Sequence, residues 1–288
     1  MQEESEKKDV EEQKPQQKPE KVEPKKQPVE KQDAPEEHLV MDITIRNSLL
    51  RTIITAISSL KTEALIQVSP KGWKIEEVDN AHVCMCAITL NSKACEEYKA
   101  DELELGIDLE KLDKLIKLAS GDCPVNITYD NQKGNCIWIQ FENVRRRMGL
   151  IDSAGMPKPK IPKLEVKAVA VLPAGQLMKS FKTCELISDH MRIVADKKDL
   201  TIGIEEDSDK TDMKWELGEG SPLSKLEVKD KSKAMYSLDY MEDELKVTKS
   251  DTLVQMKFST DSPMELDYSF NDGGLHILYL TAPRIESE

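Results

Sequence analysis

The chain contains an internal repeat, and this repeat restricts its fold more than any other feature of the sequence. The helical apolar pattern "LLRTIITAI" recurs about 128 residues later as "LMKSFKTCEL", and the strand-like "IQVSPKGWKIEEVD" recurs as "MRIVADKKDLTIGIEED". The segment "DLEKLDKLIKLAS" is likewise matched by "SLDYMEDELKVTK", and two strand-like segments follow each of them. The shared order of helix, strands, helix and strands predicts two similar domains, with Arg51 equivalent to Lys179 and Lys117 to Lys246.

Each half is predicted to hold two amphipathic helices. In the first helix, an apolar stripe at helical spacing comprises Leu49, Leu50, Ile53, Ile54, Ile57 and Leu60, with Asn47 and Ser48 as candidate caps. The second helix, within residues 108–122, places Lys111, Lys114 and Lys117 opposite its apolar side. Turns such as "NQKGN" between strand-like runs favour hairpins, so we predict an α+β fold in which the helices pack on antiparallel sheets.

Two segments lie outside the repeated pattern. Residues 1–40 are built mainly from Glu, Lys, Gln and Pro and have almost nothing to bury, so we expect a disordered charged tail. Residues 152–167, "DSAGMPKPKIPKLEVK", contain three prolines and four lysines, which predicts an extended connector. We therefore expect domains at residues 41–151 and 168–288.

Composition narrows the function classes. The 288 residues are 39% hydrophobic, and the formal net charge of −13 argues against a uniformly basic nucleic-acid coat but not against a basic patch on one face. No apolar run reaches the roughly 18 residues that cross a bilayer. The six cysteines show no disulfide-framework spacing and no secretory signal precedes them, so we expect an intracellular protein.

One stretch, "VDNAHVCMCAITL", suggests a metal or thiol site because Asp79, His82, Cys84 and Cys86 lie close together. The same spacing also arises from strand alternation, and the sequence offers no comparable second cluster of ligands, no Cys-x-x-Cys and no Gly-rich phosphate loop. No nucleophile elbow is present either. We therefore expect no enzyme, no catalytic residue, no metal and no cofactor, and we retain an enzyme using His82, Cys84 and Cys86 only as a remote alternative.

Several segments together resemble the DNA sliding clamp family of proliferating cell nuclear antigen, most of all its archaeal members. They are "SLLRTIITAISSLKTEALIQVSPKGWKIEEVDNAHV", "GIDL" with "KLIKLA", "PAGQLMKSFK", "STDSP" and the C-terminal "TAPRIESE". The resemblance implies a homotrimeric ring around duplex DNA, with sheets that continue across subunits. It also implies a processivity factor for DNA replication and repair, in the cytoplasm or nucleoid of an archaeon or in a eukaryotic nucleus. A subunit of a heteromeric or checkpoint-type clamp is the alternative.

The resemblance assigns basic residues to a DNA-facing surface without sequence preference. These residues are Arg51, Lys114, Lys117, Lys179, Lys182 and Lys246. A clamp that slides needs weak, sequence-independent phosphate contacts, which lysines on flexible stems can provide. Two departures from the family pattern reduce the expected positive charge, namely Ser58 at a usually basic position and the acidic fourth helix with Asp239, Glu242, Asp243 and Glu244.

The resemblance also implies two protein-binding surfaces. The subunit interface would use the edge strands "NVRRRMGL" and "DMKWEL", with Val144, Arg146, Met148, Leu150, Met213, Trp215 and Leu217. A pocket for short peptide motifs of DNA polymerase, clamp loader, flap nuclease and ligase would be lined by Val78, His82, Val83, Met85, Ile161, Pro162, Pro263, Leu280, Ala282 and Pro283.

Overall fold

The computed structural model describes residues 40–285, so the tail predicted for residues 1–40 lies outside the described range apart from Val40. The helices in this range are α1 (Asn47–Ser58), α2 (Leu109–Ile116), α3 (Ala174–Glu185) and α4 (Leu238–Leu245), with short 3-10 turns η1 (Ser92–Ala94) and η2 (Ser153–Gly155). The first half holds β1 (Met41–Arg46), β2 (Glu63–Ser69), β3 (Gly72–Val78), β4 (Cys84–Asn91), β5 (Glu97–Ala100), β6 (Leu103–Asp108), β7 (Pro124–Tyr129), β8 (Cys136–Phe141) and β9 (Val144–Gly149). The second half holds β10 (Ala168–Pro173), β11 (His190–Ala195), β12 (Asp199–Glu206), β13 (Asp209–Glu216), β14 (Lys225–Val228), β15 (Ser232–Ser237), β16 (Leu253–Phe258), β17 (Met264–Phe270) and β18 (Leu275–Thr281).

These strands form three antiparallel sheets. One sheet has five strands in the order β5-β1-β7-β8-β9, and another has four in the order β13-β12-β11-β15. The largest has nine strands in the order β14-β10-β16-β17-β18-β4-β3-β2-β6, so both halves of the chain contribute to it. The halves join where β18 pairs with β4, from Leu275 opposite Leu90 to Thr281 opposite Cys84.

The predicted duplication is confirmed element by element. Each half has two helices and nine strands in the same order. The strands β14-β10-β16-β17-β18 of the nine-stranded sheet correspond to the five-stranded sheet β5-β1-β7-β8-β9. In the same way, the four strands that end at β4 correspond to the four that end at β13. Each half is therefore built from one four-stranded and one five-stranded unit.

The register of the repeat corrects one predicted equivalence. Helix α1 begins at Asn47 and α3 at Ala174, so Arg51 corresponds to Met178 and not to Lys179. The second pair of helices agrees with the sequence prediction, because Lys117 and Lys246 each follow directly after their helix.

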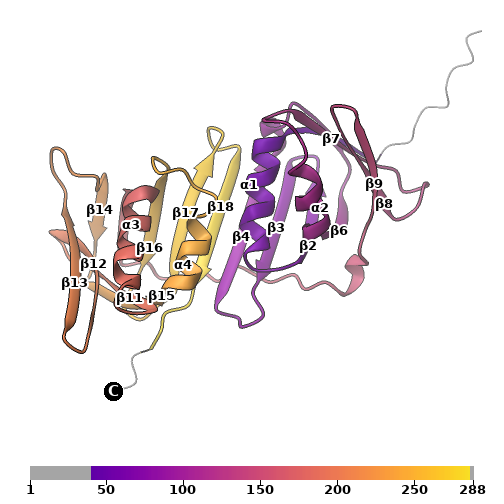
Figure 1. Ribbon diagram of the computed structural model, residues 1–288. Coiled ribbons are helices and arrows are strands. Elements are labelled where there is room, and N and C mark those ends of the chain that lie inside the picture. The colour runs from indigo at the N-terminus through magenta and orange to yellow at the C-terminus, as the bar shows by residue number, and fades with distance from the viewer. Residues whose placement is uncertain (1–39, 286–288) are drawn as a thin grey trace, which may run out of the picture. The chain divides into compact units, whose positions relative to one another are not determined.

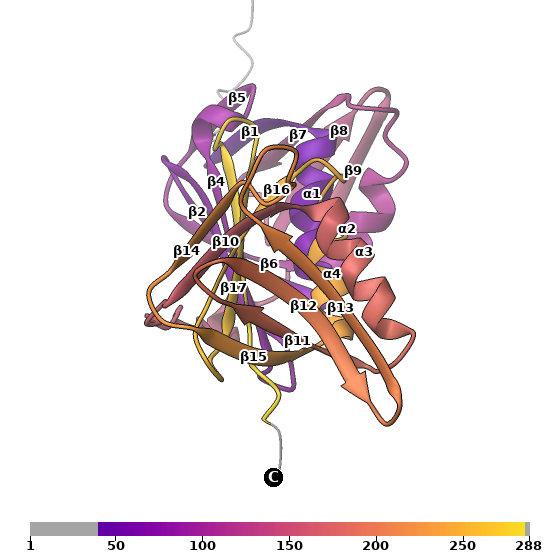
Figure 2. The ribbon, with the colours of Figure 1, turned by 90° about the vertical axis from the view of Figure 1, so that its left-hand side faces the viewer.

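All four helices lie on one face of the nine-stranded sheet (Figures 1 and 2). The apolar stripe of α1 is buried there as predicted, with Leu50, Ile53, Ile54 and Ile57 fully shielded from solvent. Leu49 is 8% exposed, and Leu60 is only half-buried because α1 ends at Ser58. None of the helices in residues 40–285 is long and apolar enough to cross a membrane.

The start of α1 differs from the prediction that its own residues cap it. The Asp122 carboxylate, from the segment before β7, accepts the backbone N–H of Ser48 at 2.9 Å. Asn47 is buried, and its side-chain amide donates to the carbonyl of Gly121 at 3.2 Å. The orphan N–H groups at this helix end are thus satisfied by a segment that is distant in sequence.

The segment between β9 and β10 crosses the nine-stranded sheet on the face opposite the helices. It starts at the β6 edge, where Ile151 forms a bridge with Gly106 and Lys158 pairs with Glu104 at 2.5 Å. It ends beside β16, where the Lys167 N–H donates to the Ser259 hydroxyl at 3.0 Å. A Cβ atom on Gly106 would lie 2.6 Å from the carbonyl oxygen of Ile151, so glycine is needed for this close approach.

Candidate functional site

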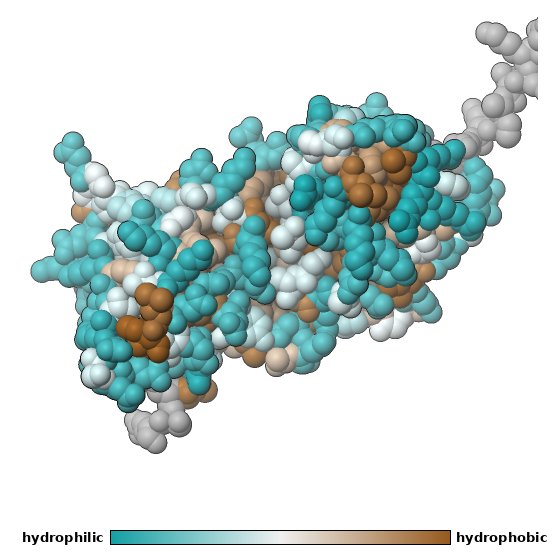
Figure 3. Space-filling view, in the orientation of Figure 1, coloured by the Kyte–Doolittle hydropathy of each residue, from teal (hydrophilic) through white to brown (hydrophobic). Residues whose placement is uncertain are grey.

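The helix face carries the six basic residues predicted to face DNA. Arg51 lies on α1, Lys114 on α2, and Lys179 and Lys182 on α3, while Lys117 and Lys246 follow α2 and α4. All six residues are exposed. Figure 3 shows this face covered largely by hydrophilic side chains, with hydrophobic patches at its upper right and lower left.

Three of these six cations pair with a carboxylate on their own helix. Lys114 pairs with Glu110 at 3.2 Å, Lys117 with Asp113 at 2.6 Å, and Lys246 with Asp243. Arg51, Lys179 and Lys182 form no ion pair within residues 40–285. Exposed pairs along one helix contribute little free energy, so the three paired lysines can exchange their carboxylate partners for other anions, and the other three cations have no such partner to give up.

The acidic character predicted for α4 is present and partly buried. Glu242 is half-buried, and burial, followed by repulsion from Glu185 on α3, raises the pKa of its carboxyl. Glu244 is 1% exposed, and burial raises the pKa of its carboxyl to about 7. Glu244 thus belongs to the core, and the acidic residues that α4 leaves exposed or half-buried are Asp239, Glu242 and Asp243.

The turn at the start of the stretch Val78 to Leu90 is organised by Asp79. The Asp79 carboxylate accepts backbone N–H groups from Ala81 at 3.1 Å and from Val83 and Cys84 at 2.8 Å. Burial acts against the charged form, but these hydrogen bonds and one from Tyr240 outweigh it and lower the pKa of Asp79. Among residues 40–285, no group of three or more His, Cys, Asp or Glu side chains could hold a metal ion.

The sequence suggested that His82 shares a strand face with the two cysteines, but in the structure it does not. It lies in the turn before β4 with a φ of 58°, and its side chain is exposed. Cys84 and Cys86 instead point into the core, where burial raises the pKa of both thiols. Buried thiols with raised pKa values are poor nucleophiles, so their environment is structural.

The two cysteines lie beside a polar cluster at the junction of the halves. The Glu244 carboxyl accepts hydrogen bonds from the Cys84 thiol at 3.3 Å and from the Thr281 hydroxyl. The Tyr268 hydroxyl donates to the backbone carbonyl of Glu244, and Glu244 Oε2 has no hydrogen-bond partner among the described residues. No feature of the sequence indicated that Glu244 would occupy a core position, because the helical pattern alone assigns it to an acidic helix.

Three residues of the predicted peptide pocket, Val78, Met85 and Leu280, are neighbours across β3, β4 and β18. Val78 pairs with Met85 across β3 and β4, and Met85 with Leu280 across β4 and β18. Met85 and Leu280 are 8% and 5% exposed but lie outside the main core cluster, which occupies the other face. The Ala282 N–H donates to the Val83 carbonyl at 2.8 Å.

Four other predicted pocket residues lie in the connector or next to β17 and β18. Ile161 and Pro162 are exposed within the connector, with 37% of Ile161 accessible. Pro263 and Pro283 are half-buried before β17 and after β18, respectively. The connector is attached to the sheet at Glu104 and at Ser259, on either side of Ile161 in the sequence.

The predicted interface residues lie on or beside β9 and β13, which are edge strands of their sheets. Arg146 and Leu217 are exposed, whereas Val144, Leu150, Met213 and Trp215 are half-buried. Met148 is 3% exposed and belongs to the core of its own chain, so its side chain has little surface left for another subunit. The backbone edge of both strands is unpaired within residues 40–285.

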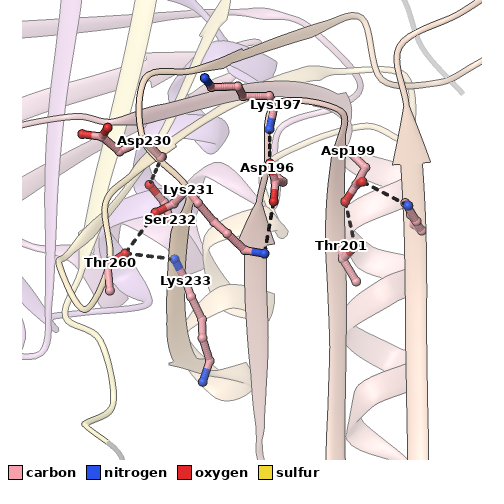
Figure 4. A network of polar contacts seen from close by, with 10 residues as sticks. Asp196, Lys197, Asp199, Thr201, Asp230, Lys231, Ser232, Lys233 and Thr260 are labelled. Carbon is pink, nitrogen blue, oxygen red and sulfur yellow. Dashed lines mark hydrogen bonds and ion pairs between the residues drawn. The ribbon is translucent and has the colours of Figure 1, made fainter.

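Ion pairs and hydrogen bonds connect the strands and turns of the four-stranded sheet that contains β13 (Figure 4). The Asp199 carboxylate on β12 pairs with Lys214 on β13 at 3.0 Å, and Lys231 pairs with Asp196 at 3.1 Å. The Thr260 hydroxyl accepts the N–H of Lys233 at 3.2 Å, which ties in the segment between β16 and β17. The first of these contacts lies at the β13 edge of the sheet, and the other two lie near β11 and β15, toward its opposite edge.

A duplicated chain with four helices on one face, basic side chains on those helices and two unpaired sheet edges defines the class of two-domain DNA clamps. Family models described as the N-terminal and C-terminal domains of proliferating cell nuclear antigen match residues 42–152 and 160–284. The chain therefore belongs to the proliferating cell nuclear antigen family, the family of DNA polymerase sliding clamps.

Individual relatives agree with this assignment. The chain is 32% identical to the DNA polymerase sliding clamp of Methanosarcina mazei over 245 residues, which covers 85% of this chain and 98% of the relative. It is 30% identical to that of Methanococcoides burtonii over 246 residues, with the same coverage. Among solved structures, the A. fulgidus PCNA bound to the C-terminal region of FEN-1 matches with a TM-score of 0.80 and 28% identity, covering 86% of this chain and all of that one.

Proposed function

We propose that copies of this chain close into a ring of three that encircles duplex DNA and tethers DNA polymerase and other replication and repair enzymes to it inside the cell. The observation that carries the proposal is the complementarity of the two unpaired edges. Within the chain, a four-stranded unit ending at β4 joins a five-stranded unit ending at β18. The free edges are β13 and β9, the counterparts of β4 and β18. Strand β9 of one copy can therefore pair with β13 of the next copy as β18 pairs with β4 within the chain.

Such a contact is heterologous, because each copy uses two different edges. A heterologous contact forms a ring when its rotation closes, and closure leaves neither edge open to aggregation. We assign the subunits domains at 41–151 and 168–288 with the connector 152–167 between them. The same edges would also serve a ring of related but different chains, although the relatives found are named simply as sliding clamps.

The helix face would line the hole of the ring. Arg51, Lys114, Lys117, Lys179, Lys182 and Lys246 would meet phosphates there without reading bases, which suits a protein that slides. The function is tethering and not catalysis, and it requires neither a metal nor a cofactor.

The sheet face crossed by the connector would dock partner peptides. Met85 and Leu280 provide an apolar floor, and Ile161 in the connector provides a rim. The C-terminal region of FEN-1 is bound to the A. fulgidus relative, which supports a peptide-docking role for this chain. Polymerase, clamp loader and ligase are further partners that the same mode of helix-in-groove binding would serve.

A topological experiment tests the ring. Light scattering of the purified chain at micromolar concentration should give the mass of three copies. The protein should then thread onto linear duplex DNA over the free ends of the DNA. If streptavidin is added after mixing to block both biotinylated DNA ends, the protein should stay on the DNA during a salt wash. Blocking the ends before mixing should prevent this retention. A monomer, or equal retention in both orders of addition, would contradict the proposal.

A further inference from the structure

The internal repeat also specifies how two copies of the chain align. Strands β17 and β18 lie on one side of the junction inside the chain, and β4 and β3 lie on the other. One row of paired residues runs across all four strands. Asp267 on β17 lies opposite Leu278 on β18, Leu278 opposite Ala87 on β4, and Ala87 opposite Glu76 on β3. Each of these residues has a counterpart at one of the free edges.

The counterparts follow from the strand registers. Asn126 and Gln255 hold the same position in β7 and β16. Asn126 pairs with Gln140 and Gln255 pairs with Asp267, so Gln140 is the counterpart of Asp267. Gln140 lies opposite Arg145, so Arg145 on β9 takes the place of Leu278. Gly203 holds the same position in β12 as Glu76 in β3 and lies opposite Asp212, so Asp212 on β13 takes the place of Ala87.

From this equivalence we infer that β9 of one copy pairs antiparallel with β13 of the next with Arg145 opposite Asp212 and Val144 opposite Met213. The inference rests on the proposed ring and adds its register. It predicts an ion pair on the sheet face away from the helices and an apolar pair on the face toward them. Directly opposed residues of unlike charge stabilise a pair of strands, and apolar pairs do so as well.

The free edges are arranged to accept this alignment. Arg145 is exposed and already oriented by the Trp138 ring, with its guanidinium carbon 4.5 Å from the ring centroid. The Asp212 side chain is 47% exposed and lies over Gly203, where a Cβ atom would come within 2.5 Å of the Asp212 carboxylate. The absence of a side chain at Gly203 therefore leaves room for the carboxylate that meets Arg145.

One pair in this register has like charges, since Arg147 would lie opposite Lys210. Both side chains have partners in their own sheets. Arg147 donates to the Cys136 sulfur at 2.9 Å, and Lys210 pairs with Glu205 at 2.7 Å. These partners draw the two cations away from each other and limit their repulsion.

Arg146, between these residues, would face the helices of the neighbouring copy. Its counterpart is Tyr279, whose hydroxyl donates to the carbonyl of Ala56 near the end of α1 at 2.7 Å. The counterpart of Ala56 is Thr183, near the end of α3. A cation is stabilised beside the C-terminal end of a helix, so arginine suits this position in place of tyrosine.

Two of the most exposed leucines lie just after the helices that this register brings together. Leu118 follows α2 and is 71% exposed, and Leu186 ends α3 and is 85% exposed. Val247, the counterpart of Leu118, is half-buried in a crevice that it shares with Leu49 of α1. An exposed leucine near each free edge fits a second copy of the chain as the occupant.

Disulfide trapping tests the register. Val144 and Met213 correspond to Ile277 and Ile88, which lie between two hydrogen-bonded pairs, where opposed Cα atoms approach to about 4.5 Å. The variant V144C/M213C should therefore form intermolecular disulfides under mild oxidation and yield a covalently closed trimer. The variant V144C/T211C and the variant V144C/W215C test shifts of two residues in either direction and should remain largely uncrosslinked.

Charge exchange provides an independent readout. R145D and D212R should each weaken trimer formation by roughly tenfold or more, since like charges then oppose each other across the interface. The double variant R145D/D212R should recover most of this loss, whereas R147D/D212R should not. Preferential trapping by V144C/T211C or V144C/W215C, or rescue through Arg147, would overturn the register while leaving the ring intact. A wild-type chain that stays monomeric would instead contradict the proposed function.

Discussion

The Tyr240 hydroxyl on α4 donates a hydrogen bond to the carboxylate of Asp79, 3.0 Å away in the turn before β4. The two residues belong to different halves of the chain and are separated by 161 positions. Because Asp79 also accepts three backbone N–H groups, the bond from Tyr240 connects the second repeat to the turn that begins the docking face. The junction of the halves is thus tied by side chains as well as by the pairing of β4 with β18.

We expect Y240F to lower the free energy of unfolding by about 1 kcal/mol, the typical contribution of one hydrogen bond. Chemical denaturation at fixed protein concentration measures this change. Y129F is a suitable control, because the Tyr129 hydroxyl makes no hydrogen bond among residues 40–285. In the background of D79N, the effect of Y240F should shrink, and equal effects in both backgrounds would show that the bond does not contribute.

Glu244 should make the stability of the clamp depend on pH. Burial raises the pKa of its carboxyl to about 7 in the folded chain, above the 4.5 expected when unfolded. The folded state therefore holds the proton more tightly, so this contribution is complete below about pH 4.5 and is lost as the pH rises through 7.

At pH 8, E244Q should be more stable than the wild type by about 2 kcal/mol, because glutamine carries no charge into the buried junction. Near pH 5 the two proteins should be similar. Denaturation midpoints between pH 5 and 8.5 measure the difference, with E110Q, at an exposed carboxylate on α2, as the control. A constant difference across this range would mean that Glu244 does not titrate there.

Charge reversal on the helix face should impair processive synthesis without disrupting the ring. The variant K114E/K117E/K179E places three carboxylates where phosphates are expected to pass, so primer extension supported by the clamp should yield markedly shorter products. The control K71E/K93E/K99E makes the same change in charge at exposed lysines outside the four helices. Equal product lengths for both variants would remove the helix lysines from the mechanism.

Substitutions at the docking face should weaken peptide binding while the chain stays folded. A peptide of the form Gln-x-x-aliphatic-x-x-aromatic-aromatic should bind the wild type, and I161A should weaken binding by roughly tenfold through loss of an apolar contact. A282D should weaken it further by placing a charge beside apolar side chains. Fluorescence anisotropy measures both effects. L253A, at an exposed leucine on β16, should bind normally, and normal binding by I161A and A282D would place the peptide elsewhere.

The sequence predicted the parts of this fold that depend on local patterns. Helical spacing located α1 with its buried Ile53 and Ile54, and the repeat located two similar halves. The family resemblance correctly indicated the clamp class. Features that depend on distant partners were missed, since neither the cap that Asp122 provides to α1 nor the contact between Glu244 and Cys84 leaves a local signal.

The predicted surfaces show the same limit. Exposure of Arg51 and Lys179 follows from helix periodicity, but periodicity could not show that Met148 turns into its own core. The ligand-like spacing around Cys84 and Cys86 was ambiguous until the burial of both thiols was known. Residue counting alone also shifted the equivalence of Arg51 by one position, because the lengths of the turns differ between the halves.

The connector does not join the halves as firmly as the sheet does. It crosses the nine-stranded sheet without becoming one of its strands, while β4 and β18 pair along seven residues each. Each half carries a four-stranded end and a five-stranded end, so a single half contains everything needed to join copies of itself head to tail. In evolutionary terms, an ancestor with one repeat could have closed a ring of six identical units, and fusion of neighbouring genes would then have made every second joint covalent.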